Sequence, residues 1–148
     1  MHSETLETIT PIVFPVLIAS FFTFVPIENF LSAYPVPLSF TWYAPWRGAL
    51  VALILWLGSG ALYSDKYYWI KLFFLGSAAG FVFFHYWHLY IVSRFAFVRL
   101  YPVVYFVGNS PPIADLGQIV VALTLIAFRR ELTSSPARAK KSKETTGR

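Results

Sequence analysis

The chain alternates long hydrophobic stretches with short polar segments, and the length of these stretches decides the fold class. A helix crosses a hydrocarbon core of about 30 Å in about 20 residues. Four stretches approach this length and are almost free of charge: residues 9–27, 48–64, 72–93 and 113–128. The pattern therefore predicts an all-α integral membrane protein, a bundle of four transmembrane helices.

The segment between the third and fourth stretches is hydrophobic but too short to cross a membrane. Residues 100–110 are apolar and aromatic, and Pro111 and Pro112 end any helix there, because proline lacks an N–H and its ring disrupts the preceding turn. We expect a short interfacial or re-entrant segment at this place.

The same boundaries divide the chain into three parts. A cytosolic N-terminus covers residues 1–8, the membrane domain covers residues 9–131, and a basic tail covers residues 132–148. The tail is rich in Lys, Ser, Thr and Ala and cannot bury enough apolar area to fold, so we expect it to be disordered and cytosolic.

Composition supports the membrane environment and excludes several kinds of chemistry. Of the 148 residues, 57% are hydrophobic and 13% are charged. A soluble domain carries roughly 25% charged residues, about twice as many. The sequence has no cysteine, so disulfides, thiolate nucleophiles and cysteine-ligated metals are excluded. It also has no phosphate-binding loop, dinucleotide fingerprint or nucleophile elbow, and no cofactor is predicted.

Basic residues set the expected orientation. Lys66, Lys71, Arg129 and the tail share one side of a four-span arrangement, whereas Arg47, Arg94 and Arg99 face the other side. Because Lys and Arg are enriched in cytosolic loops, both termini are predicted to be cytosolic. A basic run beside a span is typical of contact with anionic lipid, and we do not expect nucleic acid to be a partner.

The ionisable residues near the outer ends of the spans are the candidate site. Glu28, His85, His88 and Asp115 all fall at or near this level of the bundle. Ionisable groups that face a bundle interior are costly and are usually functional, which favours a pocket open to the non-cytosolic side. The alternative is that these residues only cap the spans where headgroups and water are available.

The histidine pair has two interpretations of its own. Residues three apart share a helix face, so His85 and His88 could point at one metal or substrate. With Glu28 or Asp115 they would form a site of two histidines and one carboxylate, as in non-haem iron proteins. Alternatively, they belong to an aromatic belt with Tyr86, Trp87 and Tyr90, where an amphipathic ring is stable without a catalytic role.

Gly76 and Gly80 form a GxxxG pattern inside the third stretch. Small residues at this spacing let another helix backbone approach closely. We expect internal packing against Gly58-Ser59-Gly60, and the alternative is a contact with another membrane protein.

The layout of four spans with cytosolic termini is similar to that of signal peptidase II. Ile113-Ala114-Asp115, which opens the last span, looks like the catalytic stretch of that family. The family needs a second aspartate after the third span, and this chain has Val92-Ser93-Arg94 there. No family is therefore assigned from the sequence, and aspartyl hydrolysis is not predicted.

Two functions follow from these observations. The first is a non-catalytic subunit or assembly partner in the membrane, because the chain has no complete catalytic motif and carries a GxxxG helix. The second is an intramembrane enzyme or binding protein for a hydrophobic small molecule, such as a lipid, sterol, polyprenyl or polyketide-like compound. In this second case Glu28, His85, His88 and Asp115 would supply the chemistry.

Overall fold

The structure is a computed structural model, and it describes residues 2–25, 43–64 and 66–133. These residues are mostly helical, which confirms the helical part of the prediction. The four helices are α1 (His2–Phe24), α3 (Ala44–Ala61), α4 (Tyr68–Val92) and α5 (Leu116–Thr133). α1 begins at His2, so residues 2–8 are helical.

Two helices in the described part of the chain are long and apolar enough to cross a membrane. They are the stretch Thr5–Phe24 of α1 and the whole of α4, Tyr68–Val92. α5 carries a shorter apolar stretch, Leu116–Arg129.

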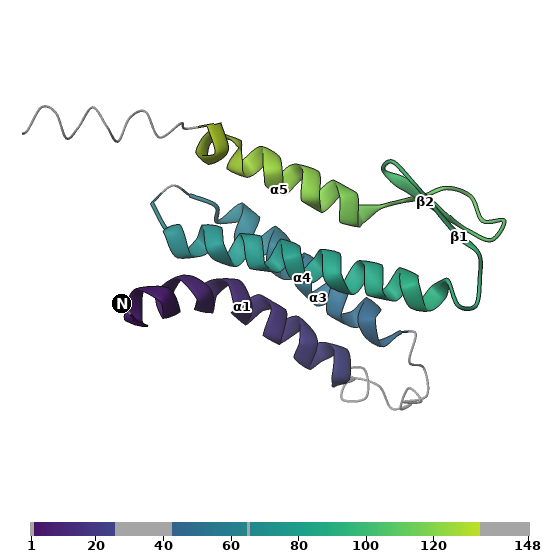
Figure 1. Cartoon of the computed structure of the whole chain (residues 1–148), viewed down its shortest axis with the longest axis horizontal. Helices are drawn as coiled ribbons and strands as arrows, with labels where there is room; N and C mark the ends of the chain where they lie inside the picture. The colour runs from purple at the N-terminus through teal and green to yellow at the C-terminus, as the bar shows by residue number, and fades with distance from the viewer. Residues whose placement is uncertain (1, 26–42, 65, 134–148) are drawn as a thin grey trace, which may run out of the picture.

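α4 is the central helix, and it packs against α1, α3 and α5 (Figure 1). Successive helices run in opposite directions, so the start of α1, the end of α3, the start of α4 and the end of α5 lie together. We name this the N-terminal end, and the opposite one the hairpin end, because the strands lie there.

The core forms where small residues of α3 let aromatic residues of α4 approach closely. α3 begins with Pro45 in its first turn, where the missing N–H costs no hydrogen bond. It then buries Gly48, Ala49 and Ala52 toward the rest of the bundle. The buried core consists of Ala19, Ala49, Ala52, Trp56, Phe74, Ala78, Phe81, Phe84 and Val120.

An aromatic cluster joins three helices toward the N-terminal end. The rings of Trp56 and Phe74 stack at 5.4 Å, and Tyr63 lies edge-on to Phe74 at 5.5 Å. Phe128 of α5 joins the same group, and Trp56 Nε1 donates a hydrogen bond to Thr124 Oγ1 at 3.1 Å. Lys71, which directly precedes the third hydrophobic stretch, is buried in α4, with its ammonium 5.5 Å from the Tyr63 ring.

Five serine and threonine hydroxyls in the helices are satisfied within their own helix. Each of five side chains donates to the carbonyl four residues earlier, at 2.7 or 2.8 Å: Thr10, Ser20, Thr23, Ser59 and Ser77. Such bonds leave these hydroxyls with no need for water, which suits helices in an apolar environment.

The segment between α4 and α5 corrects the all-α prediction. It forms a small antiparallel sheet of β1 (Val98–Tyr101), β2 (Val104–Val107) and β3 (Ile113–Ala114), in that order. β1 pairs Val98 with Val107, and β2 pairs Val104 with Ala114. Valine and aromatic residues favour strands. A two-residue turn at Pro102 closes the hairpin, so β1 and β2 pair with each other within this short segment.

Gly76 and Gly80 pack inside the chain, but not against Gly58-Ser59-Gly60 as expected: Gly76 packs against α1, and Gly80 packs against α1 and against Ala52 of α3. A Cβ at Gly76 would lie 2.1 Å from the Ile12 carbonyl oxygen, and one at Gly80 would lie 3.5 Å from Val16. Gly60 instead faces the Phe74 ring, and a Cβ at Gly58 would meet nothing within 4 Å. Because the chain's own helices cover both glycines of the GxxxG pattern, a partner helix would bind at another surface.

Candidate functional site

Asp115 is the residue on which the hairpin end is built. It immediately precedes α5, and its Oδ1 accepts a hydrogen bond from the Gln118 backbone N–H at 3.2 Å. This is the bond of a helix N-cap, which satisfies an N–H that the first turn leaves without a partner. The Gln118 side chain adds a second bond, from Nε2 to Asp115 Oδ2 at 2.9 Å. The Asp115 side chain is completely buried.

Two consecutive residues of α4 reach the same carboxylate. His85 Nε2 lies 3.2 Å from Asp115 Oδ1, and the Tyr86 hydroxyl donates to Oδ2 at 3.0 Å. Gly117 makes this approach possible, because a Cβ there would lie 2.8 Å from the His85 ring and 2.9 Å from the Tyr86 ring. The cluster of Asp115, His85, Tyr86 and Gln118, which we name the Asp115 cluster, therefore joins α4 to α5.

The Asp115 cluster also holds the hairpin turn. Gln118 accepts from the Val103 N–H at 2.9 Å and donates to the Tyr101 carbonyl at 3.0 Å. The Asp115 N–H donates to the Val103 carbonyl at 2.7 Å. Val103 has φ of +67°, a conformation that costs a β-branched residue energy and normally takes glycine. The cluster thus stabilises a strained turn as well as a helix start.

Hydrogen bonding keeps the buried carboxylate charged. Burial alone raises the pKa of Asp115, but the bonds from Gln118 and Tyr86 and the neighbouring His85 outweigh it, so the pKa lies below its ordinary value. The pKa of Tyr105, on β2, is raised by burial and then by the negative charge of Asp115. Asp115 is therefore an anion that accepts hydrogen bonds and not a proton donor at neutral pH.

The structure brings together part of the set predicted from the sequence. His85 and Asp115 are in contact, as a shared site requires. His88 lies three residues further along α4, is half-buried, and is not among the groups bonded to Asp115 in the described part of the chain. Glu28 lies outside the described residues.

No metal site is assembled by the residues that the structure covers. Among them, no group of three or more His, Cys, Asp or Glu side chains is placed to hold an ion.

Sequence reasoning missed Tyr86 and Gln118, although Gln118 carried a signal. An aspartate followed three residues later by glutamine, just before a hydrophobic run, is typical of a helix start. Tyr86 was assigned to an aromatic belt, and only the packing of α4 on α5 places its hydroxyl on a carboxylate.

Comparison with known proteins adds no relative. No protein-family model matches the chain, and no curated protein or solved structure is significantly similar to it.

Proposed function

We propose that this chain is a multi-pass membrane protein that acts as a non-catalytic subunit or assembly partner. In this proposal α1, α3, α4 and α5 all span the bilayer and both termini are cytosolic. The Asp115 cluster carries the argument. The carboxylate best placed for chemistry is buried, charged and bonded to three side chains that fix α4, α5 and the hairpin together. These bonds make the Asp115 carboxylate part of a fixed structure, and they leave it little capacity for acid-base catalysis.

The outward faces of the helices support a bilayer as the surrounding solvent. Large apolar side chains are exposed on every helix, among them Leu17, Phe21, Ile54, Leu57, Phe83 and Leu125. A soluble monomer rarely exposes contiguous apolar surface on this scale, because each patch costs free energy in water.

A groove between α4 and α5 is the surface we propose for a partner helix. It has a volume of about 500 Å³ and is lined by Leu75, Ala78, Ala79, Val82, Phe83, Val121, Thr124 and Leu125. Ala79 is exposed in it, and a small residue on an apolar helix face lets a second helix approach closely. We therefore expect the partner to contribute a transmembrane helix.

Native mass spectrometry of the complex extracted from its own membrane tests this function. The wild-type chain should carry a protein partner in fixed stoichiometry, and Ala79→Leu should reduce the bound fraction several-fold by filling the groove. Ala61→Leu is the matched control, because it makes the same substitution at an exposed position of α3 outside the groove. Recovery of the chain without any partner, or equal binding by Ala79→Leu, would refute the proposal.

A second candidate function is an intramembrane enzyme or binding protein for a hydrophobic small molecule. The contact between His85 and Asp115 favours it, since a carboxylate that orients a histidine is a common arrangement in general-base catalysis. His85→Ala separates the two. A catalyst would lose turnover of its co-purifying ligand with the thermal stability unchanged, whereas in an assembly partner His85 is structural and its loss would lower the thermal stability.

A further inference from the structure

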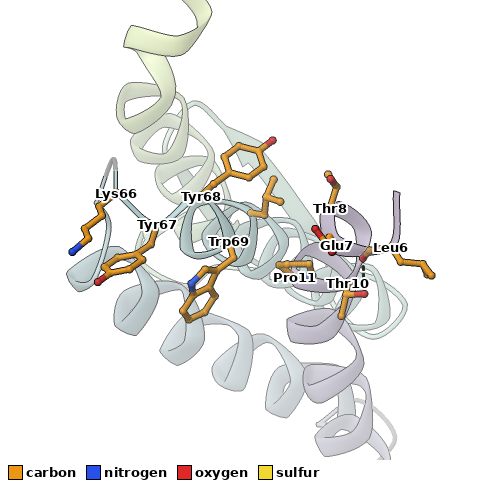
Figure 2. Close-up of a pocket in the computed structure, with 10 residues that line it drawn as sticks. Leu6, Glu7, Thr8, Thr10, Pro11, Lys66, Tyr67, Tyr68 and Trp69 are labelled. Atoms are coloured by element: carbon orange, nitrogen blue, oxygen red, sulfur yellow. Dashed lines mark hydrogen bonds between the residues drawn. The ribbon is translucent and has the colours of Figure 1, made fainter. Parts of the chain in front are cut away.

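The N-terminal end of the bundle contains a hollow of about 790 Å³ between α1 and the start of α4. Figure 2 shows Lys66 and Tyr67 on one side and Leu6, Glu7, Thr8, Thr10 and Pro11 on the other, with Trp69 between them. The two walls come from segments that are distant in sequence, so only the fold creates this space.

The charges and rings around the hollow are complementary to a zwitterion. Glu7 presents a carboxylate on the α1 side, and Lys66 presents an ammonium group on the opposite side, 5.3 Å from the Tyr67 ring. Aromatic faces together with a carboxylate attract an ammonium or choline group, and a lysine attracts a phosphate. Tyr67 and Trp69 are both exposed, so their rings are accessible to such a ligand.

The level of the hollow along the helices fits a lipid headgroup. The two stretches that can cross a membrane begin beside it, at Thr5 on α1 and at Tyr68 on α4. If these stretches span the bilayer, the hollow lies where hydrocarbon gives way to water, and Trp and Tyr are enriched at that depth.

An apolar groove next to the hollow provides room for an acyl chain. It has a volume of about 410 Å³ between α3 and α4 and is lined by Ile54, Leu55, Gly58, Ser59, Leu62, Trp69, Ile70 and Phe73. Trp69 lines both spaces, so they are neighbours on either side of one ring. Gly58 leaves the groove open, because a Cβ there would meet nothing within 4 Å.

We propose that this chain binds a zwitterionic glycerophospholipid of the cytosolic leaflet at this place. The phosphate lies toward Lys66 beside the Tyr67 ring, the amine lies between Glu7 and the Trp69 ring, and one acyl chain follows the groove past Gly58. The inference rests on the membrane-spanning arrangement proposed above.

Native mass spectrometry of the full chain in detergent micelles tests the lipid site. The protein is offered equal amounts of phosphatidylethanolamine, phosphatidylcholine and phosphatidylglycerol. The wild type should retain the first two in preference to phosphatidylglycerol, which has no amine. Glu7→Gln should remove this preference, and Lys66→Gln should weaken retention of all three about tenfold, as expected for the loss of one charge-assisted contact.

Two groove variants separate a seated lipid from a general detergent effect. Gly58→Leu should reduce retention several-fold, because a Cβ there meets nothing within 4 Å and the leucine side chain would occupy the path of the acyl chain. Ala79→Leu, in the groove between α4 and α5, should retain lipid like the wild type. Equal retention by the wild type, Glu7→Gln and Gly58→Leu would overturn the inference, and so would a preference for phosphatidylglycerol.

The outcomes also distinguish this inference from the proposed function. Release of the protein from membranes by alkaline carbonate would refute the membrane-spanning arrangement, and the lipid site with it. An integral protein that shows no lipid preference refutes the lipid site alone. Loss of the partner in Ala79→Leu with lipid retained supports both proposals independently.

Discussion

At the scale of single residues, Asp115 shows how one buried charge can hold three elements. Its carboxylate is on the chain just before α5, two of its donors are on α4, and its backbone N–H bonds to the hairpin turn at Val103. A buried anion is stable only when donors surround it, and here the donors are fixed by helix packing. Each partner thus depends on the position of the others.

Replacing Asp115 with asparagine tests this dependence. Asparagine has one acceptor oxygen, and its NH₂ group would face the donors of Tyr86 and Gln118. We expect Asp115→Asn to lower the free energy of unfolding by about 1–3 kcal/mol. Thermal unfolding in detergent, followed by circular dichroism, measures the change. Asn109→Ala, at an exposed hairpin position, is the control and should unfold like the wild type. A fully stable Asp115→Asn would show that the cluster is not structural.

The lowered pKa of Asp115 gives a second prediction at this scale. Because the pKa in the folded protein lies below its ordinary value, the unfolded chain takes up the proton first as pH falls. The contribution of Asp115 is therefore complete above about pH 4 and is lost as pH drops through the folded value.

Unfolding of the wild type and of Asp115→Asn, measured from pH 7 to pH 2, isolates this effect from other acids. The stability difference between them should stay constant down to about pH 4 and then shrink. The groups facing Asp115 are His85 and Tyr86 on α4, Gln118 on α5 and Tyr105 on β2. If the stability difference between the wild type and Asp115→Asn shrank between pH 7 and pH 5, the titrating group would be His85 and not Asp115.

At the scale of elements, the sequence predicted the helices well and the connection between α4 and α5 poorly. The length of the hydrophobic stretches located the four described helices, because each of these helices carries a long run of apolar residues. The strands were missed because residues 100–107 are all apolar or aromatic. A short apolar run of this kind is compatible with a strand and with an interfacial segment. Charge and depth brought His85 and Asp115 into one layer, but depth cannot tell which side chains face each other. Tyr86 and His88 lie at nearly the same depth on α4, and they differ mainly in the direction in which they point around the helix axis.

The contact between α1 and α4 allows a matched test one helical turn apart. A Cβ at Gly76 would strike the Ile12 carbonyl oxygen at 2.1 Å, whereas one at Gly80 finds ordinary space, with Val16 at 3.5 Å. Gly76→Ala should therefore destabilise the protein by about 1–3 kcal/mol, since the backbone of α1 must move. Gly80→Ala should be neutral or stabilising by up to about 1 kcal/mol, because alanine favours helix over glycine.

Thermal unfolding of both glycine variants reports their stability. The rate of cross-linking between engineered cysteine pairs on α1 and α4 reports the contact between the two helices. Gly76→Ala should slow the cross-link and lower the midpoint, and Gly80→Ala should do neither. Equal behaviour of the two variants would mean that α1 does not pack on this face of α4.

At the scale of the whole molecule, the antiparallel order of the helices determines which ends share a side of the membrane. Lys66 and Arg129 lie at the N-terminal end of the bundle, and Asn109 lies beyond β2 at the hairpin end. All three side chains are exposed. If the four helices span, the bilayer must separate the first two positions from the third.

Because the chain has no cysteine, single cysteines at these positions report their side directly. With cytosolic termini, Asn109→Cys should react with a membrane-impermeant maleimide in intact cells, and Lys66→Cys and Arg129→Cys should react only after permeabilisation. Reaction at all three positions in intact cells would exclude the four-span arrangement. The reverse pattern would keep the four spans but invert the orientation, and the lipid site would then face the outer leaflet. Arg129 is the sharpest of the three positions, since only a spanning α5 returns it to the side of Lys66.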